Sequence, residues 1–168
     1  MKTMKTLMQR LGLNLLVCGV GVAASAIGAA SAIAADITYE THLAFIGWQN
    51  PVKNGKMAGT VGEGRQMEAI KITQSGLPAS CKLQYKVHAA FQGWTSWIPA
   101  GIVAGSVGQG RQLEAIQIQL DNCPGWSVEY QVHAAFLGWS PWQSDSQVAG
   151  TTGQGRQIEA IRIRLKEN

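Results

Sequence analysis

The sequence has little charge and no dense stripe of basic side chains. Its 168 residues include 14 Lys and Arg and 10 Asp and Glu, and three of the basic residues, Lys2, Lys5 and Arg10, lie at the extreme N-terminus. Without those three the net charge falls to about +1. A protein that binds nucleic acid through phosphates needs clustered Lys and Arg. We therefore expect no nucleic-acid partner.

The first 35 residues have no pattern typical of a folded domain. The basic residues are followed by an apolar segment, 11–33, that is rich in Ala and Gly and ends in Ala32-Ile33-Ala34. This order predicts a secretory signal peptide (1–35), cleaved near Ala34 or Ala35. The alternative is an uncleaved anchor, because the segment is long enough to span a bilayer. We expect a single β domain, 36–168, that is secreted, periplasmic or on the cell surface, with no membrane span after cleavage.

Cysteine is scarce, and only Cys81 and Cys123 lie outside the leader. They are not equivalent within the repeats described below, because the position that corresponds to Cys81 in the next copy is Trp126. In an oxidising compartment such a pair predicts a disulfide. It would close a loop of about 41 residues and contribute about 3–4 kcal/mol to stability.

Helical periodicity is absent from residues 36–168, which instead contain three copies of one pattern. The copies span about 37–75, 83–120 and 128–165, offset by about 46 and then 45 residues, a period typical of repeat proteins. Each copy contains Tyr-x-x-His, Gly-Trp, Ala-Gly-Thr/Ser, Gly-x-Gly-Arg-Gln and Glu-Ala-Ile-x-Ile, beginning at Tyr39, Tyr85 and Tyr130.

Each copy begins and ends with alternating apolar and polar residues, which predicts strands. In copy two one face is expected to hold Leu83, Tyr85, Val87, Ala89 and Phe91. Copy three repeats this alternation with Phe136 at the corresponding position, and the closing strand of copy two is expected to place Glu114 on the face of its isoleucines. The prediction is an all-β fold with three or four strands per copy around a pseudo-threefold axis. A β-prism is the first choice, a β-trefoil the alternative, and part of a propeller the third.

Two sets of tryptophans recur. The Gly-Trp residues are expected to fill the core as structural residues: Trp48, Trp94 and Trp139. Trp97 and Trp142 lie beside Ser and Pro, and copy one has Pro51 in that region. A scaffold that tolerates Pro there does not need Trp, so we predict that Trp97 and Trp142 bind ligand by stacking, with peripheral packing as the alternative.

The recurring polar residues favour binding over catalysis. A metal site on the threefold axis would use His42, His88 and His133, but no carboxylate or cysteine recurs at ligand spacing, so no metal is expected. The glutamates are predicted to be buried structural clamps, paired with the arginine three residues earlier and with the Gly-x-Gly backbone: Glu68, Glu114 and Glu159. One such carboxylate per copy does not make an acid–base pair.

The Gly-x-Gly-Arg-Gln turns resemble phosphate-binding loops but lead into strands, so the helix N-terminus that binds phosphate is missing. Their polar side chains are predicted to hydrogen-bond sugar hydroxyls: Arg65, Arg111, Arg156, Gln66, Gln112 and Gln157.

The string Tyr-x-x-His…Gly-Trp…Ala-Gly-Thr-x-Gly-x-Gly-Arg-x-x-Glu-Ala-Ile-x-Ile strongly resembles the clostridial hydrophobic Trp (ChW) repeat, over residues 37–165. The resemblance implies an exported binding module that attaches to carbohydrates or other surface macromolecules. The sequence departs from the pattern at Ser106 and lacks a second Trp in copy one.

Together these features predict a secreted, non-catalytic, lectin-like module for carbohydrate or cell-surface binding and adhesion. The alternative is a structural or protein-binding envelope protein without glycan affinity. We expect no enzyme activity and no cofactor, because catalysis needs unlike groups brought together and the unrepeated polar residues form no recognised set. The expected partners are glycans or cell-surface macromolecules.

Overall fold

The computed structural model describes residues 34–168, and these residues form one compact unit. All elements within this range are β-strands, as the alternation predicted. No helix suited to crossing a bilayer occurs among these residues. The predicted signal peptide lies almost entirely outside the described residues.

Each copy contributes five strands, two long and three short, which is more than the three or four predicted. Copy one forms β1 (Asp36–Leu43), β2 (Gly47–Trp48), β3 (Val52–Lys53), β4 (Ala58–Gly59) and β5 (Met67–Ser75). Copy two forms β6 (Lys82–Ala89), β7 (Gly93–Trp94), β8 (Ile98–Pro99), β9 (Ala104–Gly105) and β10 (Leu113–Asp121). Copy three forms β11 (Trp126–Ala134), β12 (Gly138–Trp139), β13 (Gln143–Ser144), β14 (Ala149–Gly150) and β15 (Ile158–Glu167).

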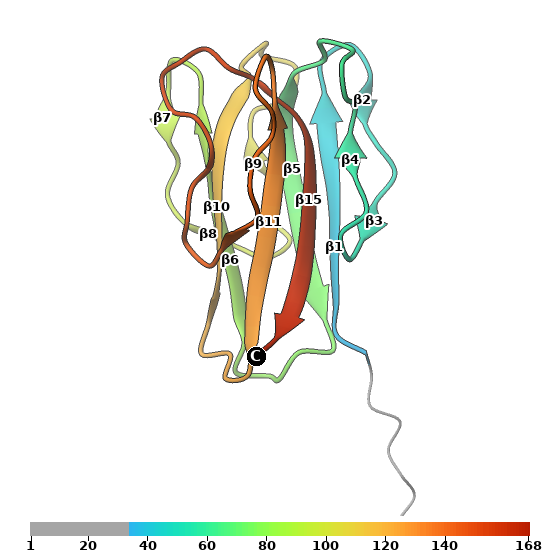
Figure 1. Cartoon of the computed structure of the whole chain (residues 1–168), viewed down its shortest axis with the longest axis vertical. Coiled ribbons are helices and arrows are strands. Elements are labelled where there is room, and N and C mark those ends of the chain that lie inside the picture. Colours follow the sequence, from blue (N-terminus) through green and yellow to red (C-terminus); the bar gives the residue numbers. More distant parts are fainter. Residues whose placement is uncertain (1–33) are drawn as a thin grey trace, which may run out of the picture. The chain divides into compact units, whose positions relative to one another are not determined.

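The strands form three antiparallel sheets of five strands, and every sheet borrows one strand from another copy (Figure 1). The long pairs are β1 with β5, β6 with β10, and β11 with β15. The Ala-Gly strand of each copy leaves its own sheet: β9 joins the first sheet, β14 the second and β4 the third. Copy one therefore supplies a strand to the sheet of copy three. The exchange of strands thus links all three copies in a closed ring.

One apolar core lies between the three sheets. It contains the inward-facing residues of the six long strands and the alanines of the exchanged strands. Its largest fully buried side chains are the tyrosines of the Tyr-x-x-His motif. The alternating pattern thus placed the core correctly along the long strands, as expected for strands with one buried face.

The buried tyrosine hydroxyls reinforce the same cyclic closure. The Tyr85 hydroxyl accepts the N–H of Ile72 (3.1 Å) and donates to the carbonyl of Ile102. Tyr130 accepts from Ile118 at 3.1 Å, and Tyr39 accepts from Ile163 at 3.0 Å, 124 residues away. Each copy is therefore bonded to the closing strand of its neighbour. Burial raises the pKa of all three tyrosines to about 12.

The glycine of each exchanged strand lies in backbone contact with the sheet it joins. Gly105 has φ +98°, and a Cβ added there would lie 2.3 Å from the carbonyl oxygen of Glu68. The following residue, Ser106, donates its N–H to that same oxygen at 3.0 Å. Only glycine fits so close an approach, which explains why Ala-Gly-Thr/Ser recurs.

The structure corrects the predicted position of two phenylalanines. Phe91 and Phe136 were expected on the buried face, but β6 ends at Ala89 and β11 at Ala134, so both residues lie in the following hairpin turns. Their side chains are 103% and 94% exposed, and both have positive φ (65° and 66°). Phe45 occupies the same position in copy one, with 98% exposure.

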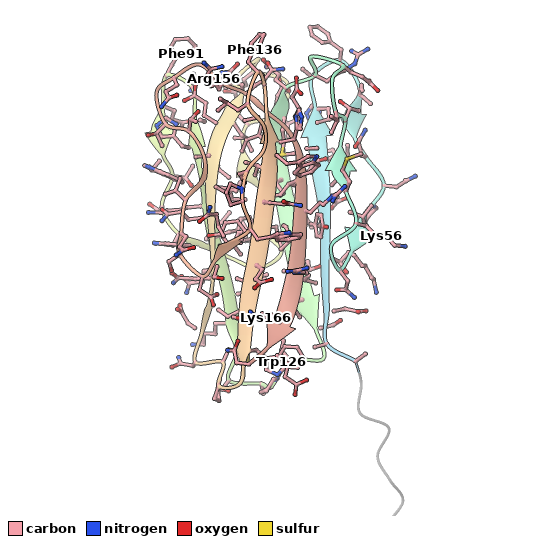
Figure 2. All side chains as sticks on the ribbon, in the orientation of Figure 1. Lys56, Phe91, Trp126, Phe136, Arg156 and Lys166 are labelled. Carbon is pink, nitrogen blue, oxygen red and sulfur yellow. A yellow bond between two sulfur atoms is a disulfide. The ribbon has the colours of Figure 1, made fainter. Side chains whose placement is uncertain are left out.

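The predicted disulfide is confirmed between Cys81 and Cys123. Cys81 immediately precedes β6, whereas the Phe91 turn follows that strand. The disulfide and the phenylalanine turns therefore lie at opposite ends of the sheets, and Figure 2 shows Phe91 and Phe136 at one end with Trp126 at the other.

Candidate binding surfaces

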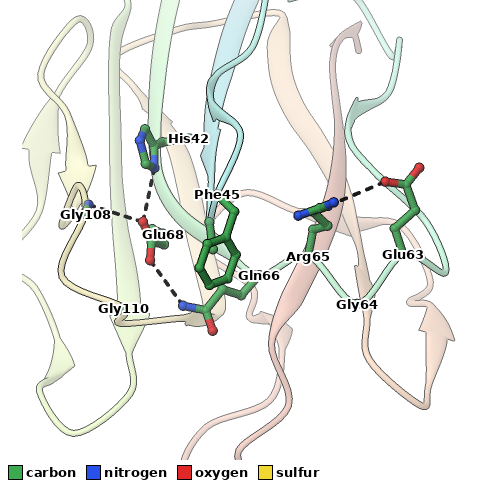
Figure 3. A pocket seen from close by; sticks show the side chains of 10 residues that line it. His42, Phe45, Glu63, Gly64, Arg65, Gln66, Glu68, Gly108 and Gly110 are labelled. Carbon is green, nitrogen blue, oxygen red and sulfur yellow. Dashed lines mark hydrogen bonds and ion pairs between the residues drawn. The ribbon is translucent and has the colours of Figure 1, made fainter.

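A cluster of buried polar side chains lies near the phenylalanine end of each sheet. In copy one, Nδ1 of His42 lies 3.2 Å from Oε2 of Glu68, and the Gln66 amide donates to Oε1 at 3.2 Å. The N–H of Gly108, in the turn of copy two, donates to Oε2 at 3.2 Å (Figure 3). The glutamate thus joins its own sheet to the turn of the next copy.

Copy two repeats the whole arrangement, and copy three repeats the histidine and glutamine contacts of its glutamate. His88 lies 3.2 Å from Glu114, which accepts the N–H of Gly153 in copy three at 3.0 Å. His133 lies 3.1 Å from Glu159. The three glutamates are only 2–4% exposed. The histidines are therefore each paired with a glutamate near the outer face of a separate sheet and do not gather on a common axis. No group of three potential metal ligands occurs among residues 34–168.

The face and one partner of these glutamates differ from the prediction. The register between Leu113 and Ala115 shifts by one residue opposite β6, so Glu114 is the extra residue of a β-bulge. A bulge re-aims a side chain, and Glu114 faces His88 rather than the isoleucines. The predicted backbone partner is present, but the predicted arginine is replaced by glutamine and histidine.

The arginines of the Gly-x-Gly turns lie at the surface of the phenylalanine end. Arg65 lies 3.8 Å from the exposed Glu63, and both line an open pocket of about 660 Å³ together with Phe45 and Gln66 (Figure 3). In copy three the Arg156 guanidinium lies 6.0 Å from the centre of the Phe136 ring.

The glutamines predicted to bind sugar form hydrogen bonds within the protein instead. The side-chain amides of Gln66, Gln112 and Gln157 donate to the buried glutamates at 3.2–3.3 Å. The amide donors of these glutamines are therefore bonded to the glutamates of the bulges. Of the arginines and glutamines predicted to bind sugar, the arginines are the more accessible to a ligand.

The Gly-Trp tryptophans are not core residues, contrary to the prediction. Trp48 is 40% exposed, and Trp94 and Trp139 are half-buried. Trp94 pairs across the strands with His88, on the face opposite to Tyr85, and its ring meets the imidazole edge-on at 5.5 Å. The strict alternation along β6 therefore continues through the hairpin, and the glycine does not turn the indole inward.

Trp97 forms an aromatic–cation site on the outer face of the second sheet. The Lys86 ammonium lies 4.9 Å from the centre of the Trp97 ring and 5.0 Å from that of Trp94. Lys86 on β6 therefore lies over both Trp94, which was predicted to be structural, and Trp97, which was predicted to bind ligand. Trp97 is half-buried, so part of its ring is exposed.

The third sheet has the corresponding site, built from different cations. Arg164 on β15 lies over Trp142 at 4.1 Å, and Arg162 lies over Trp139 at 4.6 Å. Glu129 fixes Arg164 by accepting from its Nε at 2.8 Å, and this bond together with Lys166 holds the pKa of Glu129 below its usual range. The guanidinium is therefore held in place against the indole.

The first sheet lacks this site. Glu40 stands where Lys86 stands in copy two, Lys71 corresponds to Arg162, and the two are paired with each other at 2.9 Å. The outer faces therefore carry two aromatic–cation sites, on the second and third sheets.

Sequence reasoning missed Lys86, Arg162 and Arg164, because none of them recurs between copies. A signal for them was present, since each lies on the polar face of a predicted strand. The exposed phenylalanines were missed because alternation alone does not show where a strand ends. A positive φ at Phe91 has no signature in the sequence.

The described chain is an all-β repeat protein whose three copies exchange strands and present aromatic and basic side chains on the outside. The family model for clostridial hydrophobic W (ChW) matches residues 42–76, 88–122 and 133–167, one match in each copy. The protein belongs to this family. Comparisons with curated proteins and with solved structures found no match.

Proposed function

We propose that this protein is a secreted, non-catalytic module that binds glycans of a cell surface through the aromatic–cation sites of its second and third sheets. The observation that carries the proposal is the stacking of Lys86 on Trp97 and of Arg164 on Trp142. The part of each indole ring that the cation leaves exposed offers an apolar surface to the C–H groups of a sugar. The neighbouring cation donates hydrogen bonds to hydroxyl or carboxylate oxygens.

The cations favour acidic polysaccharides over neutral ones. A carboxylate on the sugar would form charge-assisted hydrogen bonds with Lys86 or Arg164, and such bonds are stronger than neutral ones. Arg164 is held by Glu129, so little of its freedom would be lost on binding. The module is expected to hold two sugar chains, and repetition raises the avidity of two weak sites.

Affinity electrophoresis through gels containing polygalacturonate or neutral dextran tests the proposal. The wild-type protein should be retarded by polygalacturonate, and the double variant Trp97→Ala/Trp142→Ala should migrate as it does without polysaccharide. Phe91→Asn is a matched aromatic control, since it lies in an end turn rather than on an outer face, and it should be retarded like wild type. Equal retardation of the double variant and wild type would contradict the assignment.

A further inference from the structure

The end of the sheets that carries the three phenylalanine turns exposes several large apolar side chains. Its turns expose the three phenylalanine rings almost completely, at 94–103%. Ile46 and Leu137 follow two of these rings and are 48% and 56% exposed. Val61 and Val107, in the adjacent Gly-rich turns, are 42% and 48% exposed. Soluble proteins rarely expose so many large apolar side chains in one place unless that surface binds a partner.

Folding gives no reason for these phenylalanines. Phe45, Phe91 and Phe136 have φ of 65–67°, a left-handed conformation that costs stability for a bulky side chain and suits Gly or Asn. Rings that are nearly fully exposed make almost no contact with their own chain. The next residue varies freely between copies as Ile46, Gln92 and Leu137, while the phenylalanine stays. Three strained, exposed rings therefore indicate a use outside the fold.

The charges at this end suit the headgroup region of a phospholipid bilayer. Arg65, Arg111 and Arg156 lie in the turns beside the phenylalanines, and the Arg156 guanidinium lies 6.0 Å from the centre of the Phe136 ring. Glu63 is the one exposed acidic residue in these turns, and Gln109 and Gln154 replace it in the other copies. The three buried glutamates lie below this surface, each beside a histidine. Asp36, Asp121 and Glu167 lie at the opposite end, where the long strands begin or finish.

We propose that this end, formed by the turns 44–47, 90–93 and 135–138 and the adjacent Gly-rich turns, docks on a phospholipid surface. The three phenylalanine rings enter the boundary between headgroups and acyl chains, and the arginines contact lipid phosphates. A protein partner would need a matching pocket for each protruding ring, whereas a deformable lipid surface accepts separate projections. The glycan sites on the outer faces remain free in this orientation, so this is a function beyond the proposed one.

Co-sedimentation with vesicles of phosphatidylcholine and phosphatidylglycerol (3:1) tests the proposal. The protein used is residues 35–168, which contain every described strand and core residue and omit the apolar leader. The wild-type domain should sediment with the vesicles. Phe45→Asn/Phe91→Asn/Phe136→Asn should lower the partition coefficient by at least ~100-fold, since burial of three aromatic rings is lost.

Asparagine tolerates positive φ, so this triple variant should unfold at the same temperature as wild type or higher. A loss of binding in a protein of undiminished stability excludes misfolding as the cause. Arg65→Gln/Arg111→Gln/Arg156→Gln should weaken binding and reduce its dependence on salt. Trp97→Ala/Trp142→Ala should sediment like wild type, which separates this site from the glycan sites. Absence of wild-type binding, or undiminished binding by the phenylalanine variant, would overturn the proposal.

Discussion

At the scale of single residues, the glycines of the exchanged strands are the residues of the repeat that tolerate substitution least. Each lies where a neighbouring backbone leaves no room for a Cβ, and each has φ near +100°. Other glycines of the same motif have positive φ but open space around them, as at Gly110. Substitutions at the two kinds of glycine can therefore distinguish the energetic cost of a steric clash from the cost of an unfavourable φ angle.

Gly105→Ala should therefore lower the free energy of unfolding by about 3 kcal/mol or more, because its Cβ would collide with the backbone of the first sheet. Gly110→Ala, with φ +64°, should cost only about 1 kcal/mol. Urea unfolding of both variants measures the difference. Equal losses would show that β9 does not lie against Glu68 as described.

Because of the buried tyrosines, the free energy of unfolding should decrease at alkaline pH. Their pKa is raised from 10.0 to about 12 by burial, so the folded protein keeps protons that the unfolded chain releases. This contribution to stability is complete below pH 10 and is lost as the pH rises toward 12. The urea midpoint, measured from pH 8 to 11.5, should fall steadily above pH 10.

Tyr85→Phe provides the matched control for that titration. It removes one of three ionisable hydroxyls, so the midpoint should fall less steeply with pH, although its starting value is lower because Ile72 N–H and the Ile102 carbonyl lose their partner. A midpoint independent of pH between 10 and 11.5 would contradict the burial of these hydroxyls.

At the scale of the element, the β-bulge in β5, β10 and β15 gives the polar cluster its position. It turns the glutamate away from the core face toward the histidine of the paired strand, and in copies one and two also toward the Gly-rich turn of the next copy. The glutamate of the bulge therefore links neighbouring copies through its side chain, in addition to the backbone hydrogen bonds of the exchanged strand.

Glu114→Ala should lower the free energy of unfolding by about 2–4 kcal/mol, because the Gly153 N–H and the Gln112 amide would both lose their acceptor. Glu63→Ala removes an exposed carboxylate of the same end and should change stability by less than about 0.5 kcal/mol. Thermal and urea unfolding of the pair give the comparison. A cost at Glu114 no larger than that at Glu63 would refute the clamp.

The sequence predicted the elements well where one rule governs them. Alternation placed Tyr85 and Val87 correctly in a half-buried strand, and the Gly-x-Gly segments lie between strands, as expected for turns. Prediction was wrong where a local irregularity intervened. The bulge reversed the face of Glu114, and the early end of β6 exposed Phe91. Trp94, which was expected in the core, pairs with His88 on the outer face.

At the scale of the whole molecule, the three copies form a closed ring in which none is complete. Each sheet needs a strand from another copy, and each buried tyrosine bonds to the preceding copy. The period of the sequence predicted three equivalent units sharing a core. It could not show which copy supplies the Ala-Gly strand, since equivalent positions have the same sequence whether a strand pairs within its copy or with the next.

The folding of one excised copy tests this ring closure most directly. Residues 80–122 with Cys81→Ser contain β6–β10 but lack β14 and the hydroxyl of Tyr130, both of which the second sheet uses. Circular dichroism combined with sedimentation velocity would report structure and mass together. We expect an unfolded chain at monomer mass, with β-structure gained only where three chains associate. A cooperatively folded monomer would contradict the account.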